Sequence, residues 1–256
     1  MSYTKVIRKT RVSWEISEFH SGMYGAPGQE RQKKKKPTPE LIEKRNQYNK
    51  ERTARLKMQE HHEKNDYFAT FTFRVEERPP DMDTAIKLHK DFCDKVRSIY
   101  KKHGIKFKWL RNIEVGTKGA WHIHMVLNRI PDTDIIIREA WPYGKVVTQL
   151  LYEKGNFKEL AAYITKTPKT DPRLKDARYS ASRNMPLPEP VKRIYKHWKT
   201  WKEFIYPEDR DPLDSDYHVR IPKGYYLDKE SYHEGVNPFT GYKYRTYTLV
   251  KLNRGG

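Results

Sequence analysis

The sequence has almost no cysteine, because Cys93 is the only one in 256 residues. A single cysteine cannot form an intramolecular disulfide, and it cannot supply the thiolates of a cysteine-based zinc site. Cys93 also falls on the apolar face of an expected helix, so we interpret it as a core residue. A reducing compartment is the expected location.

Long apolar runs are also missing. No window approaches the length of an apolar membrane span, and the amino terminus carries no apolar signal core. The P-loop pattern of glycines followed by lysine is absent too, so no helicase motor of that type is expected. These absences predict a soluble, cytoplasmic protein with no membrane partner.

Acidic residues are scarce relative to basic ones. The chain has 52 Lys and Arg against 33 Asp and Glu, a formal net charge of +19 at pH 7. This excess indicates a polyanionic partner, and nucleic acid is the first candidate. The 18 Tyr, 9 Phe and 6 Trp can fill a core and can also stack on unpaired bases.

Composition and periodicity divide the chain into three expected parts. Residues 1–65 are predicted to be a basic, weakly structured arm followed by a charged helix from Pro39 to about His62. Residues 66–170 show the order strand, helix, hairpin, helix, strand, helix, which favours an α+β domain with helices packed on a central antiparallel sheet. Residues 171–256 are predicted to be an aromatic-rich extension that packs on that domain or on DNA.

Individual elements of this pattern have local signals. Asp83 is the expected N-cap of an amphipathic helix, and residues 156–159 resemble a capping box that opens a helix ending at Thr165 or Lys166. Residues 191–205 are predicted to form a basic aromatic helix, and the tail from Tyr217 one or two hairpins.

Two histidines, His122 and His124, lie in a strand-like run of bulky and β-branched residues. Because strand side chains alternate between faces, both imidazoles are expected on one face of the sheet. Such a pair can bind a metal if a third ligand meets it. Ordinary half-buried histidines remain the alternative for these two residues taken alone.

Glu114 is the candidate third ligand, at the end of the preceding strand. Two imidazoles and one carboxylate suit Mg²⁺ or Mn²⁺ and leave positions open for phosphate oxygens. The assignment depends on the hairpin register. A plain four-residue loop at 116–119 would send Glu114 to the opposite face, so an odd-length loop or a bulge is required. An ordinary exposed strand carboxylate is the alternative.

Tyr163 and Lys166 are expected together on the polar flank of the last predicted helix, one turn apart. A phenol oxygen can attack a phosphodiester while an ammonium group stabilises phosphate charge. In a chain with 18 tyrosines, a surface tyrosine beside a surface lysine is the simpler interpretation of this pair alone.

These elements occur in the order of the three motifs of HUH endonucleases. They are Phe71-Thr72-Phe73, then Glu114 eight residues before His122-Ile123-His124, then Tyr163-Ile164-Thr165-Lys166. From Asp66 to Pro168 the chain resembles the rolling-circle replication initiators, or Rep proteins, of small phages and plasmids, relatives of the filamentous-phage gene II protein. It departs from them in Arg74-Val75-Glu76, where polar residues often follow the first motif.

The resemblance implies a metal-dependent endonuclease that nicks single-stranded origin DNA, forms a 5′-phosphotyrosyl bond and frees a 3′-hydroxyl. Tyr163 and Lys166 would be its catalytic residues, and Glu114, His122 and His124 its metal ligands. Host helicase and polymerase are the implied partners, in a bacterial cytoplasm. A single-tyrosine transposase, a relaxase and a non-catalytic nucleic-acid-binding protein are the alternatives.

Basic residues outside these motifs are candidates for phosphate contacts. They are Lys33, Lys34, Lys35, Lys36, Lys118, Lys169, Lys192 and Arg193.

Overall fold

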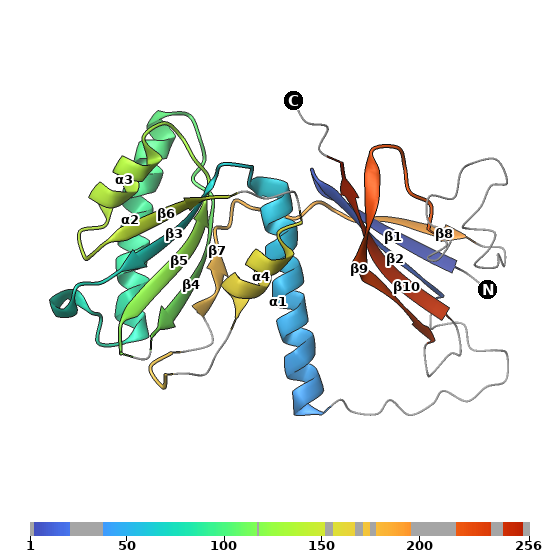
Figure 1. Ribbon diagram of the computed structural model, residues 1–256, viewed down its shortest axis with the longest axis horizontal. Helices are drawn as coiled ribbons and strands as arrows, with labels where there is room; N and C mark the ends of the chain where they lie inside the picture. The colour runs from blue at the N-terminus through green and yellow to red at the C-terminus, as the bar shows by residue number, and fades with distance from the viewer. Residues whose placement is uncertain are drawn as a thin grey trace. The chain divides into compact units, whose positions relative to one another are not determined.

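The computed structural model describes residues 3–20, 38–116, 118–151, 156–166, 171–174, 178–195, 219–236 and 243–252. Its contacts divide the chain into two compact units, one of residues 39–187 and one of residues 1–38 together with 188–256. Figure 1 shows the elements of each unit. Among the described residues, no helix is both long and apolar enough to cross a membrane.

The larger unit contains an antiparallel sheet of five strands in the order β6-β3-β5-β4-β7. The strands are β3 (Tyr67–Thr72), β4 (Trp109–Val115), β5 (Trp121–Leu127), β6 (Val146–Leu150) and β7 (Ser180–Ala181). The histidine strand β5 lies at the centre of the sheet, between β3 and β4. The predicted α+β class with a central antiparallel sheet is confirmed.

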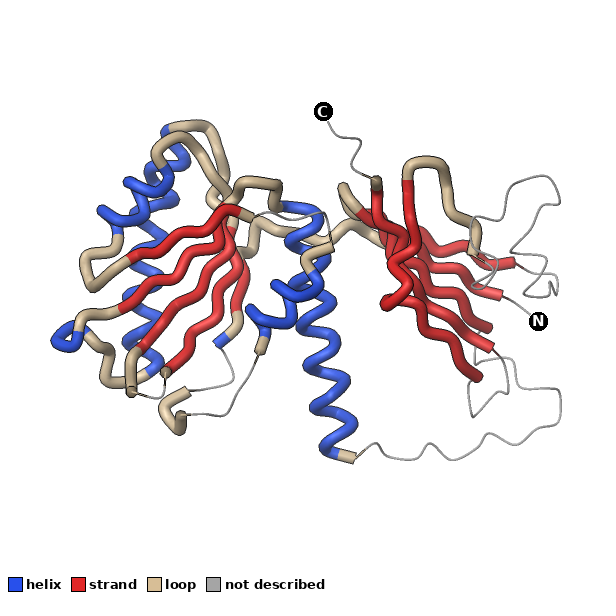
Figure 2. The backbone as a smooth tube through the Cα atoms, in the orientation of Figure 1, coloured by secondary structure: helices blue, strands red, loops and turns tan. Residues whose placement is uncertain are grey.

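Helices cover both faces of this sheet (Figures 1 and 2). α2 and α3 lie on one face, and α1 and α4 on the other. Their bounds are α1 (Pro39–His61), α2 (Met82–Lys102), α3 (Thr133–Ala140) and α4 (Lys158–Thr165), with a short 3-10 helix, η1, at Val75–Glu77.

Two of the expected caps were wrong. Asp81 rather than Asp83 caps α2, where its side chain accepts a hydrogen bond from the backbone N–H of Thr84. The capping box expected at 156–159 does not form, since α4 begins after Phe157 in the left-handed region, without a side-chain cap. Burial of the Phe157 side chain in the apolar cluster under α4 accompanies this start.

The face under α2 and α3 carries the main apolar core. Phe71, Ile123 and Met125 of the sheet are fully buried there, together with Phe92 of α2. The Phe71 ring lies edge-on to the rings of Phe92 and Trp141, at centroid distances of 4.8 and 5.2 Å. Odd-numbered residues of β3 and β5 therefore hold the core on this side.

Removal of the Phe71 ring is expected to destabilise the larger unit. Phe71→Ala should cost about 3–5 kcal/mol of unfolding free energy, because the cavity left among Phe92 and Trp141 cannot close fully. Urea unfolding followed by tryptophan fluorescence measures the loss. Val147→Ala, at an exposed position of β6, is the control and should change stability by less than about 0.5 kcal/mol. Equal effects of the two substitutions would contradict this placement of the core.

The opposite face is apolar at one end only. Leu110 and Val126 pack there against Met58 of α1 and against Ala161 and Ile164 of α4. Further along the same strands, the side chains on this face are polar. The second core thus fixes α4 beside a polar stretch of β3, β4 and β5.

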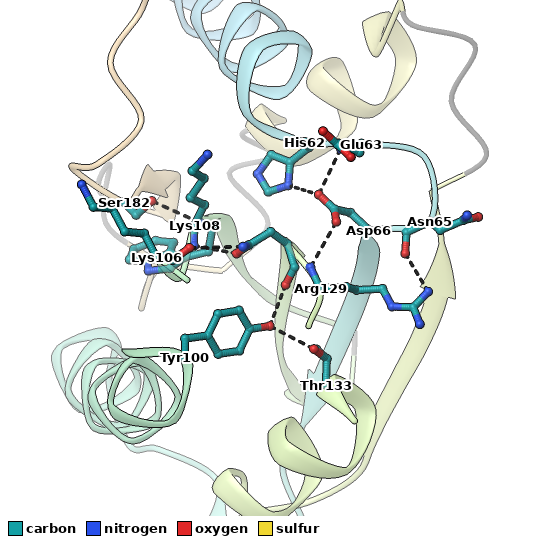
Figure 3. A network of polar contacts seen from close by, with 12 residues as sticks. His62, Glu63, Asn65, Asp66, Tyr100, Lys106, Lys108, Arg129, Thr133 and Ser182 are labelled. Atoms are coloured by element: carbon teal, nitrogen blue, oxygen red, sulfur yellow. Dashed lines mark hydrogen bonds and ion pairs between the residues drawn. The ribbon is translucent and has the colours of Figure 1, made fainter. Parts of the chain in front are cut away.

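A hydrogen-bond network joins the end of α1 to the sheet (Figure 3). The Asp66 carboxylate, just before β3, contacts His62 Nδ1 at 3.0 Å and accepts a bond from the Glu63 backbone N–H at 3.1 Å. Its other oxygen accepts from the Arg129 backbone N–H, just after β5, at 3.1 Å. One buried carboxylate therefore connects α1, β3 and β5 at the end of the sheet remote from Glu114 and His122.

The smaller unit is a second five-stranded sheet, in the order β8-β1-β2-β10-β9. Its strands are β1 (Tyr3–Lys9), β2 (Ser13–His20), β8 (Val191–Tyr195), β9 (Tyr225–Val236) and β10 (Lys243–Lys251). The expected tail hairpin is present as β9 and β10, which pair antiparallel across a bulge.

Two expectations for this part of the chain were wrong. Residues 3–9 and 13–20 are regular strands rather than a weakly structured arm, and residues 191–195 are a strand rather than a helix. β1 pairs with β2 on one side and with β8 on the other. Pairing over so large a sequence separation leaves no local signal. The rest of the helix expected at 191–205 lies outside the described residues.

The sheet pairing also shifts the divisions of the chain. α1 belongs with the larger unit, and the first strands belong with the carboxyl-terminal ones. The boundaries expected at residues 65 and 170 therefore differ from those of the two units.

The smaller unit contains a buried charge cluster. Glu18 and Arg245 are cross-strand partners and form an ion pair with almost no exposure, and Lys5 contacts Glu18 at 2.8 Å. Burial would raise the pKa of Glu18, but the charges of Lys5 and Arg245 lower it overall. The paired charges replace apolar packing at the centre of this sheet face.

Candidate active site

The hairpin register places Glu114 on the histidine face. Glu114 is the cross-strand partner of His122, and Asn112 is the partner of His124. The strands are joined by the five residues 116–120, where the Gly116 backbone N–H donates to the Ala120 carbonyl at 2.8 Å and Gly119 has a φ of +68°. The loop has the odd length that a shared face requires, so the geometric condition on Glu114 is met.

His124 lies at the centre of the polar group. Its Nε2 is 3.4 Å from Glu114 Oε2, and its Nδ1 is 3.1 Å from Thr70 Oγ1. Phe68 stacks on the imidazole with a centroid distance of 5.8 Å. Contacts on three sides hold the ring so that Nε2 points to the carboxylate.

Thr70 was not expected from the sequence. It is the cross-strand partner of His124 on β3, and only the β3–β5 register reveals that position. Its hydroxyl faces Nδ1, which leaves Nε2 as the atom available to a ligand.

His122 lies on the same face, with its ring stacked on that of His124 at 6.2 Å between centroids. Burial lowers the pKa of His122, and the nearby His124 and Arg78 lower it further, against the opposing effect of Glu114. A lowered pKa favours the neutral imidazole at pH 7, which is the form that binds metals.

Tyr163 reaches the group from α4. Its hydroxyl is 3.4 Å from His124 Nε2, and its ring lies edge-on to the rings of His124 and Phe68. The side chain is 41% exposed, so a large ligand can still approach the hydroxyl. Burial and the charge of Glu114 raise the pKa of the Tyr163 phenol, which is therefore protonated at neutral pH.

Lys166 is at the end of the same helix rather than within it. It is the C-cap residue of α4, and its backbone N–H donates to the Tyr163 carbonyl at 3.2 Å. The hydrogen bond from His124 lowers the pKa of Glu114 most, and the positive charge of Lys166 contributes in the same direction. The exposed ammonium group is thus close enough to act electrostatically at the site.

Asn112 is a second residue that the sequence did not single out. It is fully buried between the carboxylate and the end of α4, and its Nδ2 donates to Glu114 Oε1 and to the Lys166 carbonyl, each at 3.2 Å. An asparagine within a strand offers no signal of this kind until the register and the helix position are known.

The residues expected to contact nucleic acid are spread along the chain. Lys118 is exposed in the 116–120 loop beside the site. Lys192 and Arg193 are exposed on β8 of the smaller unit. Lys33, Lys34, Lys35, Lys36 and Lys169 lie outside the described residues.

The donor set was tested for its fit to a divalent cation. In the part of the chain that the structure describes, no three His, Cys, Asp or Glu side chains converge closely enough to form a metal site as they stand. Glu114 Oε2 and His124 Nε2 are 3.4 Å apart, close to the separation of about 3 Å between adjacent ligands of octahedral Mg²⁺. These two atoms fit one cation, and His122 offers a third donor on the same face.

The sheet and the polar group on its second face define a replication-associated domain of the Rep type. The comparison of families agrees, since residues 66–168 match the family of replication-associated proteins described by ORF2 and the gene II protein. This domain belongs to that family, and the protein has a replication-associated role. No curated protein and no solved structure matches the chain.

Proposed function

We propose that the protein is a rolling-circle replication initiator that nicks single-stranded origin DNA through Tyr163. One observation carries the proposal. The Tyr163 hydroxyl and Glu114 Oε2 approach the same atom, His124 Nε2, each at 3.4 Å. A nucleophile and a cation-binding carboxylate are therefore close enough to act on one phosphate.

Tyr163 supplies the nucleophilic oxygen. The phenol oxygen forms a bond to phosphorus, and the bond from phosphorus to the 3′ oxygen breaks. The phenol proton is lost, and the departing oxygen takes up a proton to give a free 3′-hydroxyl that a polymerase can extend. The phosphodiester energy is retained in the 5′-phosphotyrosyl bond, so the reverse reaction can rejoin the ends.

Glu114, His122 and His124 would hold Mg²⁺ or Mn²⁺. When bound, the cation supplies positive charge that polarises the scissile phosphate. Thr70 holds the His124 ring in the orientation that presents Nε2. Lys166 supplies a second positive charge toward the phosphate oxygens.

A nicking assay tests the proposal. Labelled single-stranded oligonucleotides from a candidate origin are incubated with protein and Mn²⁺, and covalent protein–DNA adducts are separated on a denaturing gel. Cleavage with adduct formation that stops on addition of a chelator is expected. Binding without cleavage, unaffected by the chelator, would instead identify a non-catalytic nucleic-acid-binding protein.

The exposed basic pair on β8 is expected to contribute phosphate contacts. Lys192→Ala together with Arg193→Ala should weaken single-stranded DNA binding equally for all sequences. The slope of log K against log salt should fall in magnitude by about 1.4, since each single-strand phosphate contact contributes about 0.7. Fluorescence anisotropy over a range of NaCl concentrations measures both effects.

The control pair is Lys87→Ala with Lys90→Ala, exposed on α2. α2 covers the sheet face opposite Tyr163, so the control should leave affinity and slope unchanged. An unchanged slope in the β8 double variant would exclude those residues as DNA contacts.

A further inference from the structure

The buried amide of Asn112 lies between the two halves of the site. Asn112 is on β4, on the histidine face, as the cross-strand partner of His124. Its side chain has no solvent exposure. Both atoms that its Nδ2 contacts are acceptors, the Glu114 carboxylate and the Lys166 carbonyl, which settles the orientation of the amide.

The first of these bonds orients the carboxylate. Nδ2 donates to Glu114 Oε1, while the other oxygen, Oε2, is the one near His124 Nε2. The side chain of Glu114 is only partly covered, so without this bond its carboxylate can rotate away. Asn112 therefore selects which oxygen of Glu114 is presented beside the histidine.

The second bond acts on the nucleophile's helix. Lys166 ends α4, and its backbone N–H returns to the Tyr163 carbonyl. The bond from Asn112 to the Lys166 carbonyl thus fixes the chain one turn beyond Tyr163. Gln47 of α1 also reaches this end of the helix, at Thr165, but only at 3.4 and 3.5 Å.

Packing alone does not account for an asparagine here. Asn112 Oδ1 is buried, and among the described residues it has no hydrogen-bond partner. A buried carbonyl without a partner is unfavourable. Leu110, two residues earlier on the same face, belongs to the apolar cluster beneath α4. A leucine at position 112 would continue that cluster without the unpaired oxygen.

We propose that Asn112 is a positioning residue that holds Glu114 and the carboxyl-terminal end of α4 together, so that carboxylate and phenol act on the same phosphate. The inference rests on the function proposed above. Asn112 does not touch DNA or phosphate itself; it acts through Glu114 and through the backbone that carries Tyr163.

Asn112→Leu is the main test, because leucine has a similar volume and cannot donate a hydrogen bond. Two quantities are measured on the full chain. Mn²⁺ binding without DNA is followed by electron paramagnetic resonance of the free ion, and the rate of adduct formation is followed at saturating Mn²⁺. We expect Mn²⁺ affinity to fall by about 10- to 100-fold, the usual effect of losing a residue that orients a metal ligand. The adduct rate should fall in addition.

Asn128→Ala is the matched control. Asn128 follows β5, and its side chain bonds the backbone of Lys106 and Lys108 at the opposite end of the sheet. Its loss should lower the melting temperature and leave Mn²⁺ affinity within about twofold of the unsubstituted protein. A structural role of Asn112 would produce that same pattern in Asn112→Leu.

The outcomes separate this inference from the proposed function. Unchanged Mn²⁺ affinity in a folded Asn112→Leu overturns the positioning role, as does an equal loss of affinity in Asn128→Ala. Asn112→Ala carries the same expectation as the leucine variant, and failure of both to fold would make Asn112 purely structural. If the unsubstituted protein forms no adduct, the nicking function fails, while the Mn²⁺ comparison still decides the role of Asn112.

Discussion

Tyr163→Phe is expected to abolish the covalent DNA adduct and to leave DNA binding almost unchanged. The substitution removes only the hydroxyl oxygen that would bond to phosphorus. The ring contacts with His124 and Phe68 remain, so the end of α4 should keep its position. Loss of a covalent nucleophile lowers rates by at least about 10³-fold.

The adduct is measured with DNA labelled on the 3′ side of the cleavage point, because the 5′-phosphotyrosyl bond retains that fragment. Tyr48→Phe is the control, since Tyr48 is an exposed tyrosine on α1. It should form adduct at the rate of the unsubstituted protein. Adduct formation by Tyr163→Phe at that rate would remove Tyr163 from the proposed mechanism.

Substitution of His124 is expected to have the second largest effect. His124→Ala removes the atom that both Glu114 Oε2 and the Tyr163 hydroxyl approach. Loss of the cation's electrostatic contribution, several kcal/mol, corresponds to about a 10³-fold lower rate of adduct formation. Single-turnover cleavage measured over a range of Mn²⁺ concentrations gives both the rate and the metal requirement.

Glu114→Gln tests the same site from its acidic side. The amide keeps the size of the side chain but removes its negative charge, so the Mn²⁺ requirement should rise while DNA binding is retained. His103→Ala is the control for the histidine, because His103 is exposed at the end of α2. Normal Mn²⁺-dependent cleavage by His124→Ala would exclude this histidine as a ligand.

The sequence by itself determined much of the larger unit. Alternation in Trp121–Leu127 placed His122 and His124 on one face and Ile123 and Met125 on the other, because strand side chains point to alternate sides. Apolar spacing in α2 marked the helix that covers the core. These signals are local, so they are legible without a partner strand.

The position of Glu114 was legible only as a condition. The sequence indicated that an odd-length connection was required, and the tertiary structure supplied it as residues 116–120 with Glu114 opposite His122. A shift of one residue reverses the face of every side chain in a strand. Turn geometry decides that shift, and several turns are compatible with the glycines at 116 and 119.

Only the tertiary structure decided which other residues join the site. Thr70 and Asn112 come from strands on either side of β5, and each touches His124 or Glu114 through the register of its own pairing. β1, β2 and β8 of the smaller unit likewise depend on partners far along the chain. Local patterns determine what a segment can become and which face its side chains share. Long-range pairing determines which segments meet, and at this site it brings the nucleophile, the candidate ligands and Asn112 together.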